Sequence, residues 1–318
     1  MVYQFEFRPY QRKIEQPLTT SHGVWDIREG IILRLVDAAG KVSWGEIAPI
    51  SWFGSETLAQ ALDFCRQLPA TITQETIFSI PDNLSACQFG FESALEGVGS
   101  GAWGVESSGL LPAGEGALQQ WRGLWEAGYR TFKWKIGVNA IAQELAIFDI
   151  LSGSLPKSAK LRLDANGALS YDEAKLWLQN CDNIQGKLPV EIEFIEQPLP
   201  VGELSAMLDL SKSYKTAIAL DESVATIRQL ITCYHQGWRG IFVIKPGIVG
   251  SPSRLRQFCQ QHEIDAVFSS VFETAIGRQA ALQLATKLSP KNRAVGFGID
   301  HFFAEAQATN PEILWNNL

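Results

Sequence analysis

Residues 161–167 read LRLDANG and place an acid where a strand gives way to a loop. Arg162 and Asp164 alternate with two leucines, which is the period-two pattern of a strand with one apolar face. The residues Ala-Asn-Gly that follow favour a turn. We therefore expect the carboxylate of Asp164 on a rigid strand at the edge of a loop. Taken alone, the pattern also fits a strand whose polar face meets water.

Two later strands end on acids in a similar way. Residues 191–198 read EIEFIEQP, and the proline stops the strand. Because Glu193 and Glu196 lie on opposite faces of a regular strand, only one of them is expected to face the same way as the first aspartate. We favour Glu196, since it stands at the strand end. Residues 219–223 read ALDES and put Asp221 at the end of the next strand.

Three lysines flank these acids. Residues 131–137 read TFKWKIG, so Lys133 and Lys135 share one face of a strand. In a barrel the apolar face meets the helices, and both lysines point inward, as Lys245 does at the end of a later strand. Burial and a like-charged neighbour both lower the pKa of an ammonium, so such a lysine could take a proton near neutral pH. The alternative is an edge strand with its lysines in water.

Three carboxylates that meet at one point repel one another and require a hard cation, for which Mg²⁺ with oxygen ligands fits. Lysines on opposite sides of such an ion could move a proton on either face of a substrate. A carboxylate substrate with an acidic α-carbon becomes an enediolate when it loses that proton, and the cation stabilises the new charge. The residues therefore predict metal-assisted abstraction of an α-proton.

Further polar residues lie near the same strand ends. Ser269 and Ser270 follow the seventh strand, where substrate contact and an ordinary loop role are both open. Arg162 is either a structural ion-pair partner inside the barrel or a substrate contact. Asn166 is expected to order its loop or a catalytic lysine.

The elements that carry these residues alternate between short apolar strands and helices from about residue 109 onward. Predicted strands are 109–112, 131–136, 161–164, 191–195, 217–220, 240–244, 266–269 and 294–298. Predicted helices are 117–128, 140–151, 171–180, 204–214, 223–236, 251–262 and 274–288. This rhythm favours an α/β fold, a TIM-type (β/α)7β barrel with its catalytic groups at the carboxyl ends of the strands. A doubly wound open sheet is the alternative, but only a fragment of its glycine-rich phosphate loop is present.

The first third of the chain has a different pattern, with strands at 1–14, 30–37 and 41–47 followed by helices at 55–68 and 83–96. We expect a polar, turn-prone segment at 16–26. A stretch rich in glycine and serine at 97–109 marks a boundary. The predicted domains are therefore an α+β capping domain, residues 1–100, completed by the tail 303–318, and a barrel, residues 101–302.

Composition narrows the class of protein. The chain has 318 residues, enough for a barrel and an accessory domain, and a formal net charge of −7. This charge argues against binding to nucleic acid or to anionic lipid. No signal peptide or membrane-spanning run is evident in the sequence, and the five scattered cysteines suit a reducing compartment. We expect a cytoplasmic enzyme that acts on a small molecule; the sequence leaves its oligomeric state open.

Taken together, these motifs resemble the enolase superfamily, muconate-lactonizing subgroup. The matching motifs are KWK at 133–135, DAN at 164–166, EQP at 196–198, DES at 221–223 and KP at 245–246. Within that subgroup the chain is similar to the o-succinylbenzoate synthase family of menaquinone or phylloquinone biosynthesis. That similarity is carried by WGEIAP at 44–49, FGSET at 53–57 and SSVFET at 269–274.

The resemblance implies a dehydration and a role for each residue. The implied ligands of Mg²⁺, with Mn²⁺ as a substitute, are Asp164, Glu196 and Asp221. Lys135 would remove the α-proton of 2-succinyl-6-hydroxy-2,4-cyclohexadiene-1-carboxylate and then protonate the departing hydroxide, a syn elimination. Lys133 would keep the pKa of Lys135 low, and Lys245 would stabilise the enediolate from the other face. Segments 19–23 and 50–54 match the loops that close over the substrate, which makes Thr20 a candidate contact.

Related activities stay open. Dipeptide epimerases of the subgroup carry Asp-x-Asp after strand eight, whereas residues 298–300 read GID and keep only the second acid. Neither His262 nor His301 is placed to act as the base that mandelate-racemase-like members use. Muconate cycloisomerase and N-acylamino acid racemase remain alternatives, and a barrel that binds without turnover is disfavoured.

Overall fold

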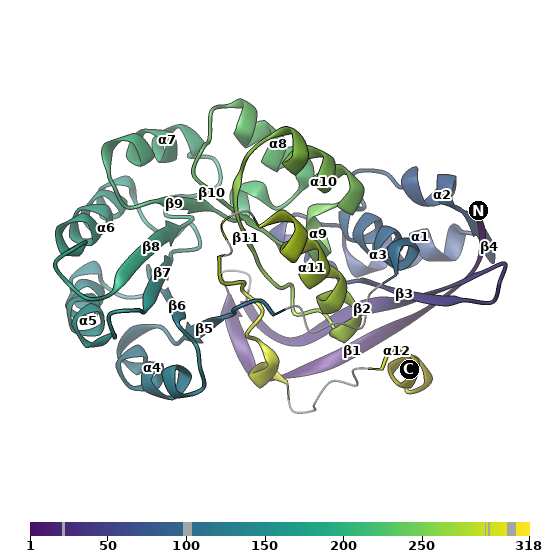
Figure 1. Ribbon diagram of the computed structural model, residues 1–318, viewed down its shortest axis with the longest axis horizontal. Coiled ribbons are helices and arrows are strands. Elements are labelled where there is room, and N and C mark those ends of the chain that lie inside the picture. The colour runs from purple at the N-terminus through teal and green to yellow at the C-terminus, as the bar shows by residue number, and fades with distance from the viewer. Residues whose placement is uncertain (21–22, 98–103, 290, 292, 304–309) are drawn as a thin grey trace.

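An antiparallel sheet and a curled parallel sheet make up the molecule (Figure 1). The computed structural model describes residues 1–20, 23–97, 104–289, 291, 293–303 and 310–318. The side chains at positions 16, 19, 20, 23 and 300 lie outside this description. The α/β barrel class predicted from the sequence is confirmed.

The antiparallel sheet has the strand order β3-β2-β1-β4. Its strands are β1 (Val2–Thr20), β2 (Gly23–Asp37), β3 (Val42–Ile47) and β4 (Thr71–Thr73). Between β2 and β3 the carboxylate of Asp37 accepts hydrogen bonds from the N–H groups of Ala39 at 2.8 Å and Lys41 at 2.9 Å. These bonds close the tight turn of the hairpin that the sequence predicts.

The prediction of a turn-prone segment at 16–26 is wrong. β1 continues to Thr20 and β2 starts at Gly23, so the two strands form one long ribbon. Their register shifts between Lys13 and Leu18, and pairing then resumes with Leu18 opposite Trp25. Both of these side chains pack against a small apolar cluster, and this burial outweighs the polar composition of the segment.

Three helices complete the N-terminal region, namely α1 (Leu58–Gln67), α2 (Gln74–Phe78) and α3 (Ser85–Glu96). Helix α3 packs directly on β3, because glycine stands at the contact on both sides. A Cβ added to Gly45 would lie 2.1 Å from the carbonyl oxygen of Gly90, and one added to Gly90 would lie 2.8 Å from that of Glu46. The main chain of β3 is thereby fixed against a buried helix.

The parallel sheet has the order β11-β10-β9-β8-β7-β6-β5. Its strands are β5 (Ser108–Leu111), β6 (Thr131–Lys135), β7 (Lys160–Asp164), β8 (Glu191–Glu196), β9 (Ile218–Leu220), β10 (Ile241–Ile244) and β11 (Asp265–Phe268). The predicted eighth strand is reduced to two isolated parallel bridges, Ser107 with Val295 and Ser269 with Gly296. Because these bridges join both edges of the sheet, they close it into a barrel.

Helices follow one another around the outside of the parallel strands (Figure 1). They are α4 (Ala117–Glu126), α5 (Ile141–Ser154), α6 (Tyr171–Ile184), α7 (Leu204–Ser213), α8 (Ile227–His235), α9 (Pro246–Val249), α10 (Pro252–Gln261) and α11 (Ala275–Leu288). The larger apolar cluster lies between the strands and these helices and includes Trp134, Leu163 and Ile195. A smaller cluster on the opposite strand faces, including Phe194 and Val243, fills the interior. This alternation directs the polar residues of the same faces into the barrel.

The chain ends with α12 (Pro311–Asn316), which lies beside the antiparallel sheet (Figure 1). Trp315 of this helix packs with Tyr10, Ile32 and Trp44. Residues 98–103 and 304–309 lie outside the described part, so the domain boundary near residue 100 and the start of the C-terminal tail stay predictions. No helix in the described residues is long and apolar enough to cross a membrane.

Candidate active site

Two buried carboxylates meet at the carboxyl ends of β7 and β8. Asp164 and Glu196 are register partners in the parallel sheet, and Lys135 of β6 is the partner of Asp164 on its other side. The ammonium of Lys133 lies 2.7 Å from Asp164 Oδ2 and 2.7 Å from Glu196 Oε1. The structure thus brings together three residues that the sequence predicts for one site.

The third carboxylate, Asp221, directly follows β9 and pairs with the ammonium of Lys245. Gln197, which is fully buried, fixes this strand end. Its side-chain oxygen accepts the N–H of Asp221 at 3.0 Å, and its amide nitrogen donates to Ser223 Oγ at 2.8 Å. This role is not evident from the sequence, although Gln197 stands inside the EQP motif. Lys245 also lies over the ring of Phe53, 4.0 Å from its centroid, in a cation–π contact.

The electrostatics of the cluster follow from burial of like charges. Burial raises the pKa of Asp164, Glu196 and Asp221, and each is raised further by a neighbouring carboxylate, which for Asp221 is Glu222. Burial alone would lower the pKa of Lys133, but the surrounding carboxylates outweigh it and raise that pKa. The expectation that burial lowers the lysine pKa is therefore wrong for Lys133, which stays charged.

The donor set fits a hard divalent cation. All the donors are carboxylate oxygens, and Glu222 Oε2 is buried beside them without a hydrogen-bond partner. Among the described residues no three metal-ligating side chains already form a cage, because the acids are turned toward the ammonium groups of Lys133 and Lys245. An ion bound at this point would relieve the mutual repulsion of the carboxylates.

A register shift explains the positions of both glutamates of β8. Opposite β7, Leu161 pairs with Ile192 and the next residue, Arg162, pairs with Phe194, so Glu193 is an extra residue in the ladder. Both Glu193 and Glu196 consequently face the interior. The expectation that only one of the two glutamates faces the interior is wrong, because β8 is not a regular strand.

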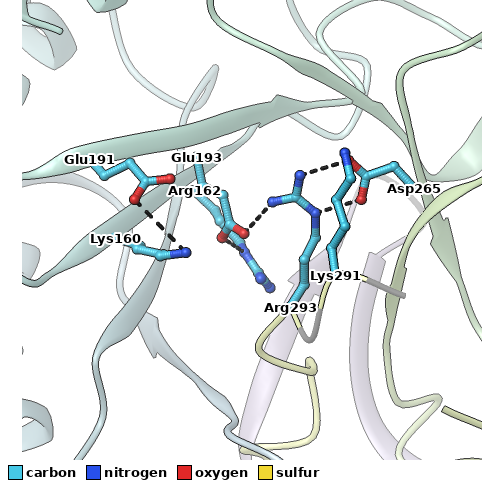
Figure 2. A network of polar contacts seen from close by, with 7 residues as sticks. All are labelled: Lys160, Arg162, Glu191, Glu193, Asp265, Lys291 and Arg293. Carbon is cyan, nitrogen blue, oxygen red and sulfur yellow. Dashed lines mark hydrogen bonds and ion pairs between the residues drawn. The ribbon is translucent and has the colours of Figure 1, made fainter. Parts of the chain in front are cut away.

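Glu193 belongs to a separate ion-pair network that includes Arg162, Arg293 and Asp265 (Figure 2). It accepts from Arg162 Nε at 2.6 Å and from Arg293 Nη1 at 2.5 Å, and Arg293 Nε donates to Asp265 at 2.6 Å. Only 2% of the Arg162 and Glu193 side chains is exposed. Of the two roles that the sequence leaves open for Arg162, these contacts support that of a structural ion-pair partner over that of a substrate contact.

Lys135 and Asn166 lie at the edge of the cluster. Lys135 is half-buried and forms no hydrogen bond or ion pair with the described residues. Asn166 adopts a φ of 44°, and its amide donates to Glu222 Oε1 at 3.1 Å. Asn166 thus ties the loop after β7 to the residue that follows Asp221, which agrees with its expected ordering role.

The two serines after β11 differ. Ser270 Oγ donates to Glu273 Oε2 at 2.9 Å and accepts from the N–H of Phe272 at 2.9 Å, so it orders its own loop. Ser269 is half-buried, and its hydroxyl forms no hydrogen bond with the described residues. Of the two, Ser269 is the better placed to bind a substrate. The side chain of Thr20 lies outside the described part of the chain.

Comparisons with known proteins match the whole chain. The family model "Enolase C-terminal domain-like" matches residues 116–314, and "MenC, N-terminal domain" matches residues 3–98. The chain is 41% identical to an o-succinylbenzoate synthase of Thermosynechococcus vestitus, over 99% of either sequence. It is 30% identical to that of Pectobacterium atrosepticum, over 83% of this chain and 80% of the relative.

A solved structure agrees with these relatives. It is the o-succinylbenzoate synthase of Thermosynechococcus elongatus BP-1, complexed with Mg in the active site. Its TM-score is 0.91 at 40% identity, covering 99% of this chain and 100% of that one. This chain, a closed parallel barrel with acids at three neighbouring strand ends, belongs to the enolase superfamily, whose C-terminal domain model matches residues 116–314. Within it, the chain belongs to the o-succinylbenzoate synthase family. The resemblance seen in the sequence is confirmed.

Proposed function

We propose that the protein catalyses the dehydration of 2-succinyl-6-hydroxy-2,4-cyclohexadiene-1-carboxylate to o-succinylbenzoate, a step of menaquinone or phylloquinone biosynthesis. The observation that carries this proposal is the buried set of Asp164, Glu196 and Asp221 at three adjacent strand ends, with lysines on both sides. The free thiols of all five cysteines support a cytoplasmic location.

Asp164, Glu196 and Asp221 would hold Mg²⁺ through carboxylate oxygens, and Mn²⁺ would fit the same ligands. When bound, the ion supplies a fixed positive charge that orients the substrate carboxylate and stabilises charge developing on it. Glu222 and Asn166 support this set from the adjacent loops, since they hydrogen-bond to each other at 3.1 Å.

Lys135 is the general base in this proposal. It has no partner among the described residues that would hold its ammonium, whereas Lys133 is held by two carboxylates. Lys135 takes the proton from the α-carbon. It then gives that proton to the hydroxide that leaves the neighbouring carbon, so water departs from the same face. The ring becomes aromatic, which drives the elimination.

Lys245 acts from the opposite side. Its ammonium is held by Asp221 and by the ring of Phe53, so its position is fixed before substrate arrives. There it stabilises the negative charge of the enediolate. Substrate contacts are assigned to Ser269, with Ser270 and Asn166 ordering the adjacent loops and Thr20 contributing from the capping segment.

The pair of opposed lysines also favours a second activity, N-acylamino acid racemisation. In a racemase one base removes the α-proton and an acid on the other face returns it, and Lys135 and Lys245 have these relative positions in the proposed site. Muconate cycloisomerisation has no additional feature of the structure in its favour.

The test follows the absorbance of the cyclohexadiene substrate with purified protein. We expect its absorbance to fall only when Mg²⁺ or Mn²⁺ is present, and the loss to stop on addition of a chelator. Parallel assays contain muconate or an N-succinylamino acid. Turnover of either one at saturating Mg²⁺, without turnover of the cyclohexadiene, would overturn the proposed function.

A further inference from the structure

We infer that Glu46 of the N-terminal region is a positioning residue for the barrel loop 269–273, and that it acts together with Arg28. This inference rests on the proposed function, because it concerns how Ser269 is presented to the substrate. Both residues lie far from the carboxylate cluster in sequence, and neither is among the residues assigned to the reaction above.

Glu46 caps a helix of the barrel from outside that helix. Its carboxylate is 1% exposed and accepts the N–H groups of Thr274 at 2.9 Å and Gly277 at 2.9 Å. It also accepts the hydroxyls of Thr274 and, at 2.5 Å, Tyr10. Thr274 is the N-cap of α11, so Glu46 satisfies main-chain donors at the positive end of that helix.

The chain around Glu46 leaves little freedom for this carboxylate. The main chain of β3 is fixed against α3 by the glycine contact at Gly45 and Gly90. On the other side Gly277 admits the carboxylate, since a Cβ there would lie 2.9 Å from Glu46 Oε2. The start of α11 is thus set by the antiparallel sheet and not only by the barrel.

Arg28 holds the middle of the same loop. This guanidinium is 2% exposed, and its Nε donates to the carbonyl oxygen of Val271 at 2.9 Å. Its other nitrogens donate to the carbonyl oxygens of Ala48 at 2.5 Å and Pro49 at 3.0 Å, just before the capping loop 50–54. One side chain therefore links the two loops that flank the proposed substrate site.

Within the loop, Glu273 and Phe272 make further ordering contacts. Glu273 is 2% exposed and accepts Ser270 Oγ at 2.9 Å and the N–H of Val271 at 2.6 Å. Phe272 has a φ of 62° and packs on Trp25, 5.1 Å between ring centroids. Ser269 is left at the barrel end of a loop that Arg28 and Glu46 hold at two points. Loosening either point is expected to misplace Ser269 and weaken substrate binding.

The test compares two isosteric substitutions of threonine N-caps. Thr274→Val removes the hydroxyl that bonds to Glu46, whereas Thr73→Val removes the N-cap of α2, at a distance from the barrel (Figure 1). We expect Thr274→Val to raise KM for the cyclohexadiene substrate about tenfold, with kcat changed less than about threefold. Thr73→Val, which also removes a threonine N-cap, is expected to leave both constants nearly unchanged.

Substitutions of Glu46 and hydrogen exchange test the same positioning role independently. Glu46→Ala removes every hydrogen bond of the Glu46 carboxylate and is expected to raise KM. Glu46→Gln keeps an acceptor oxygen and is expected to have a KM close to that of the wild type. Hydrogen exchange of residues 269–277 is expected to accelerate in Thr274→Val and not in Thr73→Val. This readout needs no turnover, so it tests the positioning role even if the wild-type protein fails to use the substrate. An unchanged KM, a loss confined to kcat, or unchanged exchange in Thr274→Val would overturn the inference.

Discussion

Lys133 and Lys135 stand two residues apart on β6, yet their surroundings differ. Lys133 lies between Asp164 and Glu196, whose charges raise its pKa, so it remains an ammonium. Lys135 is bound by none of the described side chains. A general base needs a free lone pair to accept a proton, and an ammonium held by two carboxylates has none. The division of roles between the two lysines therefore follows from their partners.

Replacing Lys135 tests this division directly. We expect Lys135→Ala to lower kcat at least ~10²-fold, because the group that moves the proton is lost. Mg²⁺ affinity, measured by calorimetry, is expected to stay close to that of the wild type, since the Lys135 side chain forms no hydrogen bond or ion pair with any of the three acids. Near-normal kcat in the variant would remove Lys135 from the mechanism.

At the scale of elements, the strands place one set of charges at the open end of the barrel and another in its interior. The interior network joins β8, β11 and the segment before the closing bridges through Arg293 (Figure 2). Burial alone would raise the pKa of Asp265 and Glu193, but hydrogen bonds and charge from arginine and lysine side chains hold both below their usual range. This network contributes stability where both acids are ionised.

The sign of the pH effect follows from these lowered pKa values. The contribution of Asp265 and Glu193 is present above the ordinary carboxyl pKa of about 4 and is lost as pH falls through their lower folded values. We expect Arg293→Met to reduce the free energy of unfolding by about 3 kcal/mol at neutral pH, because two buried acids lose a partner. Denaturant unfolding between pH 3 and pH 7 measures the free energy of unfolding of the wild type and of Arg293→Met. A difference between them that grows toward acid pH would contradict this role.

At the scale of the whole molecule, the C-terminal helix α12 packs on the antiparallel sheet of the N-terminal region. Trp315 of α12 packs on Tyr10, Ile32 and Trp44, and the guanidinium of Arg8 lies 4.3 Å from its ring centroid. The C-terminal helix lies beside β1 (Figure 1), and its tryptophan packs on residues of β1, β2 and β3. We propose that the C-terminal tail completes the capping domain, as expected from the sequence.

Removing the Trp315 side chain tests whether the C-terminal tail is a structural part of the capping domain. We expect Trp315→Ala to lower the free energy of unfolding by roughly 3 kcal/mol, because an indole that is 7% exposed leaves a cavity. The kcat of the folded variant is expected to stay within about twofold of the wild type, since α12 contacts none of the proposed catalytic residues. Tm and steady-state assays on one preparation measure both effects. A change in stability below about 1 kcal/mol would argue against a structural role for the tail.

The sequence predicts which residues stand at the carboxyl ends of the strands, because the alternation of apolar and polar residues and the turn after a strand can both be read from neighbouring positions. The positions of Asp164 and Asp221 follow from where an apolar run stops at a turn. The inward turn of Glu193 could not be foreseen, since an extra residue in β8 leaves no mark in composition. The pKa of Lys133 depends on which side chains reach it across two neighbouring strands. The caps that Glu46 forms likewise join segments more than 200 residues apart.

The central claim is that one divalent ion is held by Asp164, Glu196 and Asp221, with Lys135 and Lys245 on opposite sides of the substrate. A crystal structure with Mn²⁺ and o-succinylbenzoate, in which anomalous scattering locates the ion, tests it most directly. We predict an oxygen of each acid within about 2.3 Å of the ion, and the product ring between the two lysines. An ion bound by Glu193 instead of Glu196, or both lysines on one face of the ring, would rule out the proposed arrangement of the site.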